Sequence, residues 1–341
     1  MHVVLPGDID DPAEPSGGNH YDRRVCAGLA ALGWTVREHP VPGTWPHSSR
    51  AARARLATLL DGLADGSTVL LDGLVGCAVA DLLLPRADRL RLVLLVHLPI
   101  GGPAERAALR AAAAVVTTSC WTRRMLLARH RLDPGTVHVA EPGVDAAELA
   151  PGTAAGAELL CVATVSAVKG HDVLVDALAL LGDRPVHCSC VGSLTRDPGF
   201  VDRLRGRIRG QGLSDRVRLL GARVGVDLAA GYAAADVLVL AARSEAYGMV
   251  ISEALARGLP VIATDVGGIA ETLGTAPDGT RPGLLVPPDQ PAALAEALGS
   301  WLADAGLRDR LRAAARQRRG SLAGWERTVD RLAAVLARVA A

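Results

Sequence analysis

Short apolar runs alternate with amphipathic stretches along the whole chain. The apolar runs have the length of strands and lack the polar alternation of a half-exposed strand, so they predict strands that are buried on both faces. The stretches between them have helical periodicity. In residues 19–32, Val25, Leu29 and Leu32 share one face, and Gly33 follows as a C-terminal cap. Buried strands that alternate with helices predict an α/β fold with parallel sheets.

The expected strands form two sets, separated by a break of small residues at 151–156. The first set is residues 2–6, 35–41, 68–71, 90–97, 114–118 and 137–140, and the second set is residues 158–165, 186–191, 217–220, 237–240, 261–264 and 284–286. Two sets within 341 residues predict two doubly wound, Rossmann-like domains, at residues 1–150 and 158–320. Such folds bind ligands at the carboxyl ends of their strands, so two of them facing each other would form an interdomain cleft.

Residues 321–341 predict a further helix, whose apolar side chains need a partner surface. Leu332, Val335, Leu336 and Val339 fall on one face of it. The N-terminal domain is one surface on which this helix could pack.

Composition and charge argue against several classes of partner. Charged residues make up 21% of the chain, the net charge is +1 and aromatic residues make up 3%. Neither sign of charge dominates and stacking side chains are scarce, so the sequence does not point to a nucleic acid or another polyanion. The sequence predicts no transmembrane helix and no signal peptide, while peripheral contact with a membrane stays open.

Cysteine usage indicates reduced, structural thiols. The six cysteines show neither a disulfide framework nor the spacing of a zinc site. Cys188 and Cys190 lie in an apolar run, and we interpret them as core residues rather than as redox groups or metal ligands. Reduced thiols are typical of a cytoplasmic protein. The oligomeric state stays open.

Two glutamates stand in the segment that follows the expected strand at 237–240. Glu245 precedes the predicted start of a helix at Tyr247, and Glu253 lies within that helix. Eight residues of helix rise about 12 Å, whereas the two carboxylates of a glycoside hydrolase lie roughly 5 to 9.5 Å apart. The spacing therefore suits contacts with two ends of one elongated ligand better than hydrolysis of one bond.

The residues between the two glutamates predict an anion site. Gly248, Met249 and Val250 place amides near a helix N-terminus, where the helix dipole favours an anion and glycine permits close approach. A nucleoside diphosphate sugar has the matching order of sugar, diphosphate and ribose. The alternative reading is structural: Glu245 stabilises the helix dipole and Glu253 lies on a solvated face.

The same segment resembles the E-x7-E motif of family 4 of the retaining glycosyltransferases. The resemblance extends over about residues 158–320. Lys169-Gly170-His171-Asp172 resembles the K-G-h-d element of that family, and Tyr232-Ala233-Ala234-Ala235-Asp236 resembles its Y-x-x-A-D element. Further matches are Val191-Gly192, Leu220-Gly221, residues 253–262, Gly267-Gly268 and Glu271.

This resemblance implies the GT-B fold, with the donor nucleotide bound mainly by the C-terminal domain. It implies that Glu253 holds the ribose hydroxyls, that Glu245 contacts the donor sugar and that Lys169 neutralises the diphosphate. It also implies sugar transfer with retention of configuration and without a metal ion or cofactor. The expected route is front-face displacement onto a small-molecule, lipid or polysaccharide acceptor.

Two features of the first half are further site candidates. Ser16-Gly17-Gly18-Asn19 follows the first strand and resembles the N-terminal glycine loop of the family, so Gly17 and Gly18 are expected near the donor phosphate or the acceptor. A plain turn is the alternative. His97 ends the strongest apolar strand and resembles the active-site histidine of the family, which would hydrogen-bond the donor sugar or support the developing cation through its backbone. A structural histidine is the alternative.

The chain also departs from the family pattern. Ala163-Thr164 stands where Gly-Arg is usual, which removes a bidentate phosphate contact, and Arg243 or Arg223 are candidates to replace it. Pro142 stands where the family has an asparagine. Asp8-Ile9-Asp10 matches the D-x-D metal motif only superficially, and we expect a solvated loop without a metal there. These departures leave the identity of the donor open.

Other functions are compatible with the same residues. One is a sugar-nucleotide epimerase on the same fold, and another is a non-catalytic nucleotide-sugar-binding partner of a second transferase, which the change at Thr164 would explain. An NAD-dependent oxidoreductase is disfavoured because the G-x-G-x-x-G fingerprint is missing. The base, the sugar and the acceptor are not identified by the sequence.

Overall fold

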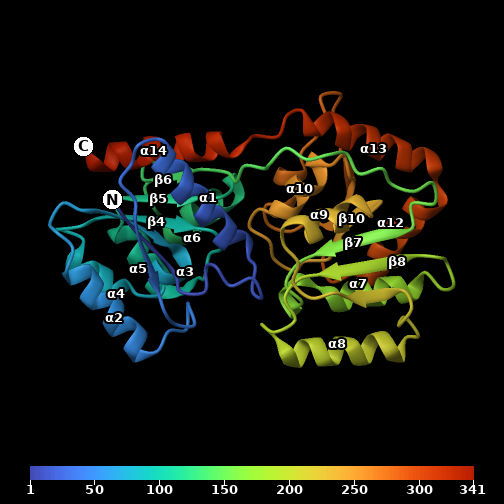
Figure 1. Ribbon diagram of the computed structural model, residues 1–341, viewed down its shortest axis with the longest axis horizontal. Helices are drawn as coiled ribbons and strands as arrows, with labels where there is room; N and C mark the ends of the chain where they lie inside the picture. The colour runs from blue at the N-terminus through green and yellow to red at the C-terminus, as the bar shows by residue number, and fades with distance from the viewer. The chain divides into compact units, whose positions relative to one another are not determined.

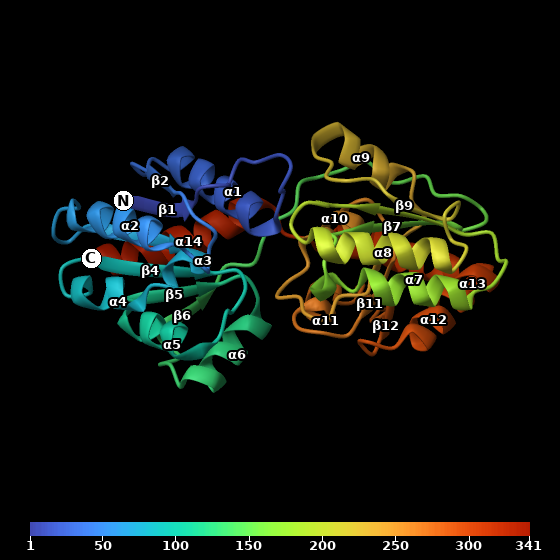
Figure 2. The same ribbon diagram turned by 90° about the horizontal axis from the view of Figure 1, so that it is seen from below.

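The computed structural model describes residues 1–341 as two compact units. The N-terminal unit contains Met1–Asp10, Gly17–Gly143 and Ala323–Ala341, and the C-terminal unit contains Asp11–Ser16 and Val144–Leu322. In each unit, helices cover both faces of one sheet (Figures 1 and 2). Each unit has its own sheet and its own hydrophobic core.

The sheet of the N-terminal unit has six parallel strands in the order β2-β1-β3-β4-β5-β6. The strands are β1 (His2–Pro6), β2 (Arg37–Val41), β3 (Thr68–Asp72), β4 (Arg91–Val96), β5 (Ala114–Thr117) and β6 (Val137–Val139). From β1 the chain first runs to β2 at one edge and then back past β1 towards β6, so the direction of winding reverses between β1 and β3. Doubly wound sheets bind ligands at the carboxyl ends of the strands beside such a reversal.

Helix α14, the last of the chain, packs on the N-terminal unit (Figure 1). The other helices of this unit are α1 (Gly17–Ala31), α2 (Arg50–Asp61), α3 (Gly73–Gly76), α4 (Ala80–Leu83), η1 (Leu84–Arg86), α5 (Gly102–Ala111) and α6 (Cys120–His130), and α14 spans Trp325–Ala340. Leu332 and Leu336 of α14 are fully buried. A Cβ on Gly28 of α1 would lie 2.3 Å from Cγ2 of Val329, so the two helices touch closely. The apolar face that the sequence predicts for the last helix therefore packs on the N-terminal unit.

The sheet of the C-terminal unit is also parallel and six-stranded, in the order β12-β11-β10-β7-β8-β9. The strands are β7 (Glu158–Val162), β8 (His187–Val191), β9 (Val217–Leu219), β10 (Val237–Leu240), β11 (Val261–Thr264) and β12 (Gly283–Val286). Alternate residues of one strand pack in different hydrophobic clusters of this unit. Leu159 and Cys161 of β7 belong to one cluster, and Leu160 belongs to another. This explains why the sequence shows continuous apolar runs rather than an alternation.

The helices of the C-terminal unit follow their strands closely. They are η2 (Ala167–Lys169), α7 (His171–Leu180), α8 (Pro198–Gly210), α9 (Gly225–Ala233), α10 (Met249–Ala256), α11 (Ile269–Leu273), α12 (Pro291–Ala303) and α13 (Ala305–Arg319). None of the helices in the structure is both long and apolar enough to cross a membrane.

The boundary between the units falls between Gly143 and Val144, earlier than the predicted boundary at residue 150. The amide of Ala150 donates to the carbonyl oxygen of Arg257 at 2.9 Å. The guanidinium of Arg319 donates to the carbonyl oxygen of Ala147 at 2.6 Å. These two bonds attach the segment to the C-terminal unit before the small-residue break is reached.

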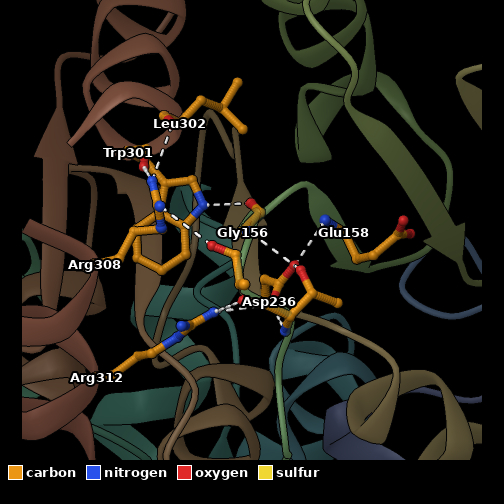
Figure 3. Close-up of polar contacts among 9 residues, drawn as sticks. Gly156, Glu158, Asp236, Trp301, Leu302, Arg308 and Arg312 are labelled. Atoms are coloured by element: carbon orange, nitrogen blue, oxygen red, sulfur yellow. Dashed lines mark hydrogen bonds and ion pairs between the residues drawn. The ribbon is translucent and has the colours of Figure 1, made fainter. Parts of the chain in front are cut away.

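The break itself is ordered by a buried aspartate at the base of β10 (Figure 3). Asp236 accepts hydrogen bonds from the backbone and side chain of Thr153 and from the amide of Glu158, and it pairs with Arg312 of α13 at 2.9 Å. The indole of Trp301 donates to the carbonyl oxygen of Gly156 at 2.7 Å. The small residues of the break therefore lie in an ordered segment of the C-terminal unit and do not form a linker between the units.

The predicted α/β class and both parallel sheets are confirmed. Deviations are confined to element ends. The strand predicted at 158–165 ends at Val162. The amides of Ala163 and Val165 still donate to the carbonyl oxygens of Val191 and Ser193 at the end of β8. The helix predicted at 19–32 begins two residues earlier, at Gly17.

Candidate functional site

The segment between β10 and α10 is shaped by glycines on two sides. Gly248 has a φ of +86° and forms the N-cap of α10, which begins at Met249. The amide of Gly268 donates to the carbonyl oxygen of Glu245 at 2.9 Å. Gly267 has a φ of +60°, and a Cβ there would lie 1.8 Å from the same carbonyl oxygen. The backbone of Glu245 is therefore fixed by close contact that only glycine allows.

Glu245 and Lys169 form an ion pair. The Lys169 ammonium lies 2.7 Å from Oε2 of Glu245, and both side chains are partly exposed. Lys169 ends η2 and is followed by Gly170, where a Cβ would lie 1.9 Å from the carbonyl oxygen of Ala241. The loops that follow the neighbouring strands β7 and β10 thus approach each other closely and bring the lysine to the glutamate.

Arg243 is bound to carboxylates of its own unit. Its guanidinium makes two 2.9 Å bonds to the carboxylate of Asp172 and one 2.6 Å bond to Asp289, and it also donates to the carbonyl oxygen of Ala167. Burial alone would raise the pKa of Asp172, but the hydrogen bonds and charge of Arg243 lower it below its ordinary value. Arg243 therefore serves to tie the loop after β10 to η2 and α7. Because its guanidinium is already paired with Asp172 and Asp289, Arg243 is a poor candidate to replace the phosphate-binding arginine that is missing at Thr164. The other candidate, Arg223, is exposed.

Glu253 is oriented by a buried tyrosine. The Tyr232 hydroxyl donates to Oε2 of Glu253 at 2.8 Å, and the guanidinium of Arg257 lies 4.4 Å from the centre of the Tyr232 ring. Burial and the charge of Glu253 raise the pKa of Tyr232 well above its ordinary value, so its hydroxyl stays a donor. Glu253 is thus a partly buried, oriented carboxylate and not a residue of a fully solvated face.

The remaining sequence candidates lie in the N-terminal unit. His97 follows β4, and its Nε2 lies 2.7 Å from Oδ1 of Asp22 and 3.5 Å from Oδ2 of Asp72. A Cβ on Gly18 would lie 3.3 Å from Cδ2 of His97, so the backbone of α1 passes close to the imidazole. Gly17 and Gly18 belong to the first turn of α1 rather than to a loop, which corrects the glycine loop expected from the sequence.

The three titratable groups of this cluster shift one another's pKa values. Burial and the neighbouring charge of Asp22 raise the pKa of Asp72 to about 7. Burial alone would lower the pKa of His97, but the charge and hydrogen bond of Asp22, together with the charge of Asp72, raise it. A histidine in this setting favours the charged form.

Sequence reasoning identified His97 but missed Asp22 and Asp72. One usable signal was present for Asp72, because a carboxylate that ends a strand of apolar residues needs a specific partner. Asp22 offered a weaker signal within the amphipathic helix α1. The structure thus pairs Lys169 with Glu245 and groups His97 with Asp22 and Asp72, while Glu253 is held separately by Tyr232.

The aspartates and cysteines singled out in the sequence are engaged elsewhere. Asp10 is exposed and bonds to Nε of Arg23 at 2.7 Å, as expected for a solvated loop. Cys188 and Cys190 are buried with their sulfurs 3.9 Å apart, as predicted for core residues. The hydrogen bond with Cys161 alone would lower the pKa of Cys190, but the hydrogen bond with Cys188 and burial together raise it well above its ordinary value, so this thiol is neutral.

Comparison with known proteins agrees with this arrangement. Residues 155–318 match the family model described as glycosyl transferases group 1. The D-inositol 3-phosphate glycosyltransferase of Jonesia denitrificans is 34% identical over 254 residues, which cover 69% of this chain and 59% of that protein. The corresponding protein of Salinispora tropica is 36% identical over 234 residues, 61% of this chain and 47% of that protein. The chain thus spans between about half and three fifths of the length of these relatives.

Solved structures with the same fold cover nearly the whole chain. Sucrose-phosphate synthase from Thermosynechococcus elongatus has a TM-score of 0.76 at 24% identity, over 99% of this chain and 98% of its own. Anabaena Alr3699/HepE, in complex with UDP-glucose, has a TM-score of 0.77 at 19% identity, over 99% of this chain and 100% of its own. These likenesses confirm the GT-B class of the fold. Through residues 155–318, the chain belongs to the group 1 family of glycosyl transferases.

Proposed function

We propose that the protein is a retaining glycosyltransferase that moves a sugar from a nucleoside diphosphate sugar to an acceptor hydroxyl. The observation that carries the proposal is the Lys169–Glu245 ion pair, which lies on the loops after two neighbouring parallel strands. The relatives named for D-inositol 3-phosphate glycosyl transfer and the Anabaena complex with UDP-glucose support the same reaction class.

Each donor group has a candidate partner in the C-terminal unit. Lys169 and the amides of Gly248, Met249 and Val250 would hold the diphosphate, because unpaired amides at a helix start and an ammonium both favour anions. Glu253, oriented by its bond from Tyr232, would accept hydrogen bonds from the ribose hydroxyls. Glu245 would then face the sugar once the diphosphate attracts the lysine away from it.

The proposed chemistry needs no nucleophile from the protein. The acceptor oxygen bonds to the anomeric carbon on the face that the diphosphate leaves, and the bond from that carbon to the phosphate oxygen breaks. The acceptor proton passes to the departing phosphate oxygen. Lys169 stabilises the negative charge that develops on the diphosphate, and His97, Gly17 and Gly18 of the N-terminal unit are our candidates for contacts with the sugar or acceptor.

We further propose that the reaction needs neither metal nor cofactor, because Lys169 and the helix amides supply the positive charge that a divalent ion would otherwise supply. Turnover should persist in excess chelator at a rate within about twofold of that with added magnesium. A strict requirement for a divalent ion would contradict this part of the proposal. The six free cysteines, five of them buried, suit a cytoplasmic site of reaction.

Donor identity can be tested on the intact protein. A ligand that binds only the folded state stabilises it by about 2.7 kcal/mol at a hundredfold excess over Kd, and the melting temperature rises accordingly. Nucleoside diphosphates and their sugars should therefore separate in a thermal-shift screen, and the best donor should then be turned over with a panel of acceptors that includes inositol phosphates. Binding without turnover on every acceptor would favour a non-catalytic binding partner, and release of an epimerised donor would favour an epimerase.

A further inference from the structure

A carboxylate pair lies under the imidazole of His97, within the N-terminal unit. Asp22 comes from α1 and Asp72 ends β3, and each is only 2% exposed. The nearest polar atoms of Asp22, Asp72 and His97 all lie within 4.8 Å of one another. Neither carboxylate has a nearby lysine or arginine among its hydrogen-bond partners. Two buried carboxylates at this separation cannot both carry a full charge without a large energetic penalty.

We propose that Asp22 and Asp72 are positioning residues that share one proton and hold His97 as an imidazolium ion, leaving its Nδ1–H as the donor offered to a ligand. In this arrangement Asp72 is neutral and Asp22 is charged. The proton resides on Oδ2 of Asp72 and is donated to Asp22. Nε2–H of His97 is donated to the other oxygen of Asp22.

The hydrogen bonds of the two carboxylates support a proton on Asp72 rather than on Asp22. Oδ1 of Asp72 already accepts from the amide of Leu74 at 2.6 Å, which leaves Oδ2 to carry the proton. Oδ1 of Asp22 accepts from His97, whereas its Oδ2 is buried and lacks a donor. A buried carboxylate oxygen without a donor is destabilising. A proton on Asp72 supplies that donor, and the pKa of Asp72, raised to about 7, agrees with it.

The surroundings fix the ring of His97 and leave one nitrogen for a ligand. The edge of Tyr21 contacts the imidazole with ring centres 5.0 Å apart, and the Tyr21 hydroxyl is committed to the carbonyl oxygen of Ala140. Burial raises the pKa of Tyr21, so this phenol stays neutral. The charge of Asp22 also raises the pKa of Tyr21, and the charge of Arg331 of α14 opposes it. Because both carboxylates face Nε2, Nδ1 is the ring nitrogen that remains.

His97 therefore acts as a hydrogen-bond donor and not as a base. An imidazolium stabilises negative charge on an oxygen of the substrate, and it loses that ability when it is deprotonated. Since Asp22 raises the pKa of His97, the charged form persists to higher pH than in an ordinary histidine and is lost as the pH rises through that raised value. The effect on turnover rests on the proposed glycosyl transfer, whereas the protonation of His97 does not.

The direct test is NMR titration of the full-length protein labelled with ¹⁵N-histidine, with His97 assigned by comparison with His97→Gln. We expect His97 to titrate above about 6.5, the ordinary value for histidine. Asp22→Asn should lower the pKa of His97 by about one unit or more, because burial then acts without the carboxylate. Asp72→Asn, which imitates a neutral Asp72, should lower the pKa of His97 clearly less than Asp22→Asn does, because the charge of Asp72 contributes less to it than Asp22 does. An unchanged His97 in Asp22→Asn, or equal shifts in both variants, would overturn the proposal.

Turnover supplies a second readout that a purely structural role would not move. The alkaline limb of the kcat profile should shift to lower pH in Asp22→Asn, with kcat at pH 8 reduced by up to about tenfold for each unit by which the pKa of His97 falls. In Asp72→Asn the limb should shift less. If both variants lose activity and chelator also abolishes it in the wild type, a cation and not a proton joins the carboxylates, and the proposal is wrong. If the protein transfers no sugar at all, the proposed function fails while the titration result stands.

Discussion

Lys169 and Glu245 neutralise each other in the structure, yet each has a separate task in the proposed reaction. Lys169→Ala should reduce kcat/KM on the order of a hundredfold or more, because it removes the charge that stabilises the leaving diphosphate. Glu245→Ala should reduce kcat by a similar factor, with a smaller effect on binding of the nucleoside diphosphate alone. Arg205→Ala, on an exposed pair of α8, is the control and should leave both parameters unchanged. Near-wild-type rates in both site variants would remove these residues from the site.

Gly267 offers a sharper test of the same site through the backbone. A Cβ at Gly267 would lie 1.8 Å from the carbonyl oxygen of Glu245, so Gly267→Ala must displace the segment that carries the glutamate. We expect a loss of turnover of at least tenfold. Gly279 has a φ of +86° with open space around it, so Gly279→Ala carries the same backbone strain without the clash. Equal activities of the two alanine variants would show that the position of Glu245 is not critical.

At the scale of elements, the sequence allowed accurate prediction of the sheets and much less of the His97 cluster. Buried parallel strands read as continuous apolar runs, and the segment of Glu245 and Glu253 is local in the chain. Asp22, Asp72 and His97 come from three different elements, and periodicity carries no information on which elements meet. Gly17 and Gly18 were expected in a loop because of the resemblance to the family, whereas they form the first turn of α1, where a Cβ on Gly18 would lie 3.3 Å from Cδ2 of His97.

Arg243 holds the loop after β10 against η2 and α7. A second aspartate of α7 serves as the control for a test of this contact. Asp172→Asn should weaken both bonds to Arg243 and let the Lys169 turn move relative to Glu245, lowering donor affinity about tenfold. Asp176, one helical turn further along α7, forms an equally short pair with Arg207 of α8. Asp176→Asn should therefore leave donor affinity unchanged. Isothermal titration with the best nucleotide would measure both, and equal affinities would contradict a positioning role for Arg243.

At the scale of the whole molecule, the small-residue break at 151–156 lies inside the C-terminal unit and contributes to the stability of that unit. Residues 151–156 are the stretch of the chain richest in small residues, and their order depends on Asp236, which is completely buried. Four polar groups donate to this carboxylate: the amide and hydroxyl of Thr153, the amide of Glu158 and the guanidinium of Arg312 (Figure 3). Breaking a buried ion pair by removing one partner typically costs about 3–5 kcal/mol.

Asp236→Asn should therefore lower the free energy of unfolding of the C-terminal unit by about 3 kcal/mol or more. The amide keeps the shape of the carboxylate but leaves Arg312 without its counter-charge and places an NH₂ group among donors. Asp202→Asn removes an exposed pair with Arg205 and should change that free energy by less than about 1 kcal/mol. Hydrogen exchange under increasing urea, followed in peptides from 144–160 and 305–319, would locate the change in the C-terminal unit. Equal protection in the two variants would mean that residues 151–156 are held by packing of Trp301 and its neighbours rather than by Asp236.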